Sequence, residues 1–148
     1  MTLPNSTTRE PVIAPVEDKR LDRLLDYTKF HIGIYLSIGG GLVALIGSAS
    51  KADEHAFLGK FIGSHWALAV ALALMLLSGL AGGIIASCCT QFHTFEDVWN
   101  EKHGPHKLKL LKGQTWAVIE HSTFWLSLLA FGYAILSAKG VIEWLFKS

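Results

Sequence analysis

Residues 66–85 read WALAVALALMLLSGLAGGII, and this stretch decides the fold class. Between Ala67 and Ile85, Ser78 is the only polar side chain. A helix of this composition has no polar face, whereas a helix on the surface of a soluble protein has one. About 20 apolar residues suffice to cross the ~30 Å hydrocarbon core of a bilayer. The stretch therefore predicts a membrane-spanning helix.

Two further stretches have the same character. No Asp, Glu, Lys or Arg lies between Lys29 and Lys51, and Glu120 is the only one between Gly113 and Ala138. A charged side chain is costly in hydrocarbon, so these runs also suit membrane spans. The sequence predicts an all-α polytopic integral membrane protein with three transmembrane helices, at about 30–50, 64–88 and 114–138.

The remaining segments are expected to lie at or outside the membrane surface. Proline and small polar residues predict a flexible tail before a single membrane domain. Three segments carry apolar residues at helical spacing next to charged ones, which is typical of interfacial amphipathic helices. The predicted boundaries are 1–16 for the tail, 17–148 for the membrane domain, 90–113 for the main loop, and 17–28, 90–103 and 141–148 for the interfacial helices.

Composition excludes several classes of function. Of the 148 residues, 51% are hydrophobic and 17% charged, and the net charge is +1. No basic excess exists to neutralise nucleic-acid phosphates, so we expect no nucleic-acid partner. There is no glycine-rich phosphate loop, and the adjacent Glu120 and His121 diverge by about 100° on a helix. We therefore predict that the protein is not an enzyme.

The distribution of positive charge predicts the orientation. Lysine and arginine gather in the N-terminal segment and in the loop 90–113, and are fewer between the first two spans and after the third. Cytoplasmic loops carry the excess of positive charge. We expect a multi-pass protein of the cell (inner) membrane, with the N-terminus in the cytoplasm and the C-terminus outside.

Small residues recur along the first two spans. Association of helices in lipid depends on close packing, which small side chains allow. These stripes predict either packing within one protomer or, as we favour for the protein as a whole, a homo-oligomer or a complex with other membrane subunits. The predicted packing residues are Gly33, Ser37, Gly40 and Ala44 in the first span, and Gly79 and Gly83 in the second.

Ionisable and polar residues fall at one depth near the cytoplasmic end. Glu120 is expected to face the interior and to meet Lys29 or His31, because ionisable groups in spans find partners. A structural clasp is one interpretation. A second is an ion or proton pathway, in which an oligomeric pore is lined by the third span. The predicted polar layer comprises Lys29, His31, Glu120, His121, Thr123 and Ser127.

Two ligand sites are alternatives to the structural clasp. His31 and His121, on different helices at similar depth, form the candidate axial pair of a haem b; otherwise no cofactor is expected. A metal site in the loop is the weaker idea, since no CxxC or HExxH spacing exists. Acylation of the two cysteines is the alternative at that boundary. The loop candidates are His93, His103, His106, Cys88 and Cys89.

The sequence thus leaves three functional hypotheses. The first is a self-assembling or accessory scaffold subunit of a membrane complex. The second is a small oligomeric channel or membrane-perturbing effector. The third is a haem-binding redox anchor.

Overall fold

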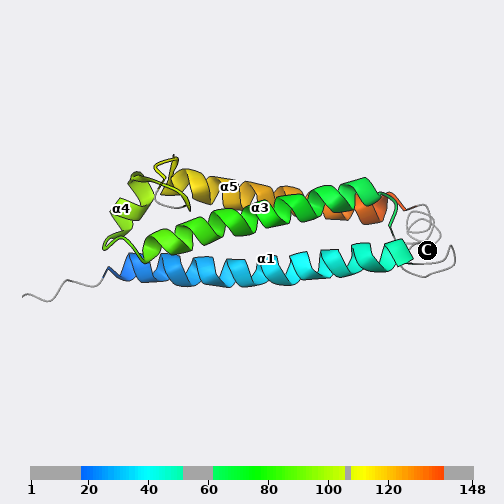
Figure 1. Ribbon diagram of the computed structural model, residues 1–148, viewed down its shortest axis with the longest axis horizontal. Helices are drawn as coiled ribbons and strands as arrows, with labels where there is room; N and C mark the ends of the chain where they lie inside the picture. The colour runs from blue at the N-terminus through cyan, green and yellow to red at the C-terminus, as the bar shows by residue number, and fades with distance from the viewer. Residues whose placement is uncertain (1–17, 52–61, 106–107, 139–148) are drawn as a thin grey trace, which may run out of the picture.

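The computed structural model describes residues 18–51, 62–105 and 108–138, in which three long helices run side by side (Figure 1). All three are long and apolar enough to cross a membrane. The mostly helical fold with three candidate spans is therefore confirmed. The helices are α1 (Lys19–Lys51), α3 (His65–Cys89) and α5 (Gly113–Leu136).

Helix α3 is the central element, because it packs against both α1 and α5 (Figure 1). Its sequence is apolar all round, which suits a helix with neighbours on two sides. At one end of the bundle, Leu68 and Ala71 of α3 pack against Leu42 of α1 and Ala134 of α5. A backbone hydrogen bond from Gly63 to the Ala134 carbonyl, 2.8 Å long, joins the segment before α3 to α5 at this end.

The other end of the bundle carries the connection between α3 and α5, and we call it the hairpin end (Figure 1). A short helix, α4 (Phe95–Asn100), begins where Thr94 accepts a hydrogen bond from the backbone of Asp97. Strands β1 (Lys102–His103) and β2 (Leu111–Lys112) then pair antiparallel. Strand β2 runs directly into α5.

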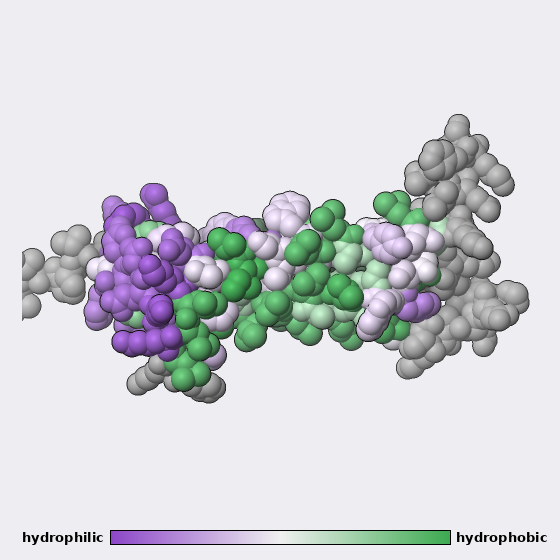
Figure 2. Space-filling view, turned by 90° about the horizontal axis from the view of Figure 1, so that it is seen from above, coloured by the Kyte–Doolittle hydropathy of each residue, from purple (hydrophilic) through white to green (hydrophobic). Residues whose placement is uncertain are grey.

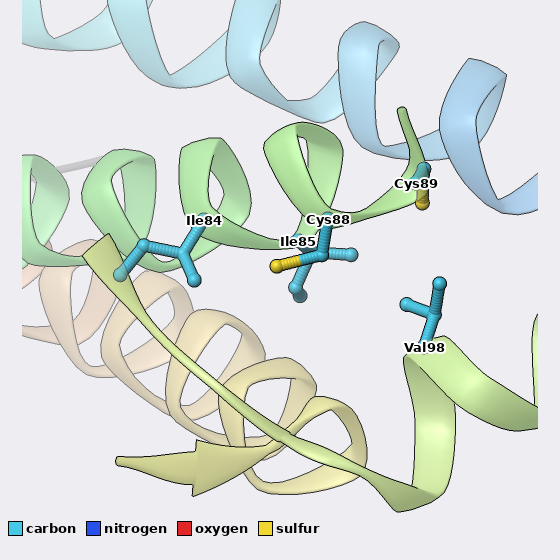
Figure 3. Packing of buried hydrophobic residues seen from close by; sticks show 5 residues of the cluster. All are labelled: Ile84, Ile85, Cys88, Cys89 and Val98. Carbon is cyan, nitrogen blue, oxygen red and sulfur yellow. The ribbon is translucent and has the colours of Figure 1, made fainter. Parts of the chain in front are cut away.

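Val98 attaches α4 to the bundle. It is fully buried, and it packs against Ile84, Ile85, Cys88 and Cys89 at the end of α3 (Figure 3). The start of α5 approaches the same residue so closely that a Cβ on Gly113 would collide with the Val98 carbonyl. Only glycine fits there, so Gly113 allows the start of α5 to pack closely against α4.

The surface divides along the long axis. Hydrophobic side chains cover the middle of the bundle, and hydrophilic ones gather at the hairpin end (Figure 2). Exposed large hydrophobic side chains lie on the outer faces of all three long helices. A soluble monomer rarely exposes so large an apolar area.

The predicted interfacial helices differ from the structure. The predicted helix 17–28 is not a separate element, since α1 begins at Lys19 and continues past residue 28 without a break; residue 17 lies outside the described residues. Its 33 residues span about 50 Å at 1.5 Å per residue, which exceeds the ~30 Å hydrocarbon core. The predicted helix 90–103 is much shorter than expected, because Thr94 caps its start and Glu101 is already extended. The tail 1–16 and the segment 141–148 lie outside the described residues.

Candidate functional site

Glu120 lies where the three long helices meet. Its side chain is 1% exposed, and its Oε1 accepts a hydrogen bond of 2.9 Å from the Tyr35 hydroxyl of α1. Ser78 of α3 donates to the Glu120 backbone carbonyl at 2.7 Å. Gly82 of α3 leaves the space for the carboxyl group, since a Cβ there would lie 3.3 Å from Oε1. Glu120 is thus contacted by both neighbouring helices, α1 and α3.

The partner of Glu120 is neither of the two predicted. Lys29 lies exposed on the outer side of α1, the Nδ1 of His31 lies 2.8 Å from the Tyr27 carbonyl, and the hydrogen bond to Glu120 comes instead from Tyr35. The sequence analysis missed Tyr35 and did not connect Ser78 or Gly82 with Glu120. A usable signal was the spacing of Tyr27, His31 and Tyr35, which recur every four residues and so share one face of a helix.

Thr123 and Ser127 continue the buried face of α5. Ser127 donates to the Ala71 carbonyl of α3 at 2.7 Å, and Thr123 donates to the Ile119 carbonyl of its own helix at 2.7 Å. Both side chains are buried within the protomer. A pore lined by these residues and Glu120 would require the contact between α3 and α5 to open.

The two histidines lie together toward the hairpin end. Their ring centroids are 6.0 Å apart, and Tyr27 lies against His31 at 3.9 Å between centroids. In each ring, Nδ1 lies within hydrogen-bond distance of the carbonyl four residues earlier, at 2.8 Å for His31 and 2.9 Å for His121. A carbonyl only accepts, so Nδ1 donates. In neutral His121, Nε2 then accepts from the Tyr27 hydroxyl at 2.7 Å.

This arrangement does not fit a haem between His31 and His121. The Tyr27 hydroxyl occupies Nε2 of His121, which is the atom that would bind iron. The hollow beside His121, about 430 Å³, is lined by α4 and α5 residues such as Trp99 and Val118, with no contribution from His31. The histidines are instead joined to a tyrosine and to backbone carbonyls.

The loop residues proposed for metal binding are also dispersed. Among the described residues, no group of three or more His, Cys, Asp or Glu side chains could hold a metal ion. Cys88 and Cys89 are buried in the apolar cluster around Val98, and His93 is exposed (Figure 3). His106 lies outside the described residues.

His103 is the unusual residue of the loop. It is 6% exposed, and neither ring nitrogen has a hydrogen-bond partner among the residues that the structure describes. Burial lowers its pKa below the ordinary value of 6.5, because the apolar surroundings disfavour the imidazolium. Its backbone carbonyl accepts a bond of 2.9 Å from the Trp116 indole, which ties β1 to α5.

The N-terminus of α1 is attached to α4 by polar contacts. The Asp18 carboxylate accepts a bond of 2.8 Å from the backbone N–H of Phe95, and this bond lowers the pKa of Asp18 below 3.8. Arg20 forms an ion pair of 2.9 Å with Glu96 and lies over the Phe95 ring. These contacts fix the loop against the first helix.

The four predicted packing residues of α1 lie on its outer face. Gly33, Ser37, Gly40 and Ala44 are exposed, and a Cβ at either glycine would meet nothing within 4 Å. The Ser37 hydroxyl donates to the Gly33 carbonyl, so it needs no other partner. The opposite face, with Tyr35 and others, packs inside the protomer. This set of four residues is the outer stripe.

The two predicted packing residues of α3, Gly79 and Gly83, differ in their surroundings. A Cβ at Gly79 would lie 3.9 Å from the Tyr35 Cβ, so this glycine faces α1. Gly83 is open and lines a hollow along α3.

Comparison of the chain with protein-family models, with curated proteins and with solved structures found no match to any of them.

Proposed function

We propose that the protein is a multi-pass membrane protein that assembles with further copies of itself through the outer stripe of α1, and so acts as a scaffold subunit of a membrane complex. Its N-terminus and the loop 90–113 lie in the cytoplasm, and its C-terminus lies outside. The observation that carries the proposal is that the stripe takes no part in packing among the described residues of the protomer. Packing between α1 and α3 uses the opposite side of α1.

A stripe of small residues is unfavourable on a helix face that contacts only lipid. Glycine is a poor helix former, and a small side chain makes fewer contacts with lipid than a leucine. The gain comes only when a second backbone approaches closely. The spacing of Gly33, Ser37, Gly40 and Ala44 alternates between four and three residues, which favours a left-handed crossing near +20°.

The charges on α1 favour a second copy as the occupant. Lys19, Asp22, Asp26 and Lys29 continue the outer stripe toward the hairpin end at the same spacing. All four are exposed, and none has an ion-pair partner within the described residues. Two copies inserted in one orientation pair their α1 helices in parallel. This neutral patch then faces its own equivalent, and Lys29 of one copy can reach Asp26 of the other.

Cysteine cross-linking tests the interface. In a background in which Cys88 and Cys89 are alanine, Ser37→Cys is expected to give a disulfide dimer in membranes. Leu129→Cys, on the outer face of α5 at 70% exposure, is expected to give none. Gly40→Leu should abolish the cross-link, whereas Gly41→Leu should preserve it, since Gly41 is equally open but lies off the stripe.

The outcomes separate the parts of the proposal. A protein that remains in the supernatant without detergent would contradict membrane insertion. A monomer that inserts but gives no cross-link at residue 37 would contradict self-assembly. Cross-linking through residue 129 alone would move the interface to α5 and overturn the role of the stripe.

A further inference from the structure

The β1–β2 hairpin brings two lysines face to face. Lys102 and Lys112 are partners in the antiparallel ladder, and both are exposed. Like charges directly opposite each other destabilise a strand pair. Neither lysine has an ion-pair partner among the described residues, and Lys109 adds a third exposed positive charge. A ladder of only two residues per strand gains little that would offset this repulsion.

The same hairpin exposes apolar side chains. Leu108 is 54% exposed, Leu110 49% and Leu111 36%. Lysine and leucine alternate here along the chain, so charge and apolar surface are presented together. Such a mixture is typical of segments that lie at a membrane interface, where lysines reach the headgroups and leucines enter the acyl region.

A hollow of about 570 Å³ adjoins the hairpin and extends along α3. Gly104 and Pro105 form its hairpin side, while Ser87 and Gln91 lie at its polar end. Further along α3 the lining becomes apolar, and Gly83 leaves it open. The hollow therefore runs along α3 from the hairpin end toward the middle of the bundle. Hydrophilic side chains gather at that end, and hydrophobic ones cover the middle (Figure 2).

We propose that the hairpin end binds an anionic phospholipid, whose phosphate lies near Lys102 and Lys112 and whose acyl chain lies in the hollow beside Gly83. This inference rests on the membrane insertion proposed above. The phosphate offsets the repulsion between the paired lysines, and the acyl chain fills the apolar part of the hollow. Position supports the assignment, since β2 leads directly into α5 and therefore lies where the apolar helices begin.

Native mass spectrometry of the full chain, extracted from bilayers that hold equal amounts of phosphatidylglycerol and phosphatidylcholine, tests the proposal. We expect retained phosphatidylglycerol to exceed phosphatidylcholine. Each positive charge near an anionic surface contributes enough that the ratio should fall roughly fivefold for each lysine removed. The test variants are Lys102→Gln and Lys112→Gln, singly and together. The matched control for each single substitution is Arg23→Gln, which removes the same charge from an exposed residue of α1 outside the outer stripe.

Two more variants separate binding from folding. Lys102→Glu places opposite charges in the ladder, so hydrogen exchange at the hairpin should slow while the preference for phosphatidylglycerol is lost. Gly83→Leu keeps the lysines but fills the hollow, so it should lower retention of the lipid. Equal retention of the two lipids by the wild-type chain would overturn this proposal alone. Failure to enter the bilayer would instead overturn the proposed function.

Discussion

Two neighbouring glycines of α3 offer a sharp test of the buried Glu120. A Cβ on Gly82 would lie 3.3 Å from Glu120 Oε1 and 3.4 Å from Ile32 Cγ1, whereas a Cβ on Gly83 would meet nothing within 4 Å. Alanine in place of either glycine gains about 0.5–1 kcal/mol of helix stability. At residue 82 this gain is opposed by overpacking, which costs about 1–3 kcal/mol.

The atom displaced by Gly82→Ala is also the acceptor of the Tyr35 hydroxyl at 2.9 Å, so the hydrogen bond weakens as the carboxyl group moves. We expect Gly82→Ala to be less stable than Gly83→Ala by about 1–3 kcal/mol. Unfolding in mixed micelles by added sodium dodecyl sulfate, followed by far-ultraviolet circular dichroism, measures the difference. Equal stabilities, or a more stable Gly82→Ala, would refute the view that the space at residue 82 accommodates the carboxyl group.

Three further predictions concern single contacts. Tyr35→Phe leaves a buried carboxyl group without its donor and should cost about 1–3 kcal/mol in the same assay, whereas Tyr133→Phe, on an exposed tyrosine, should be neutral. Asp18 has a lowered pKa, so its contact with the Phe95 backbone is present above pH 3.8 and is lost as pH falls through the folded pKa. Hydrogen exchange at the Phe95 amide should then accelerate. In Asp18→Asn, the exchange rate should lose this acid dependence. The pKa of His103 is likewise lowered, so the unfolded chain binds the proton first and stability should fall as pH drops below 6.5; a wild-type-like pH profile in His103→Phe would contradict this role.

The helices could be predicted from the sequence because each is encoded by a long apolar stretch. Runs such as 66–85 integrate many residues, so the predicted and observed boundaries of α3 and α5 agree within about two residues. The hairpin could not be predicted in the same way. Its strands have two residues each, too few for a periodic pattern, and the Gly104-Pro105 pair is typical of the end of a helix and does not by itself predict a strand. The alternation of lysine and leucine after it was the available signal.

Only part of the candidate site could be predicted from the sequence, and the reason is a different one. Position along a helix predicts depth, so His31 and His121 could be expected near each other, and their rings do lie 6.0 Å apart. Rotation about the helix axis is set by packing, which a single sequence does not reveal. The choice of Tyr35 over Lys29 as the partner of Glu120 depends on that rotation.

The inner contacts of α1 also determine what its outer face can do. The hydrogen bond from Tyr35 to Glu120 and the burial of Leu42 hold one side of α1 against the rest of the bundle. Rotating the helix by half a turn would bring the outer stripe inward and place the tyrosine hydroxyl on the outer surface, which on the proposed function faces lipid chains and offers no partner. The clasp around Glu120 therefore fixes the direction in which Gly33 and Gly40 face. A buried polar contact of this kind contributes specificity of orientation, and on the proposed function that orientation is what makes the stripe available to a second copy.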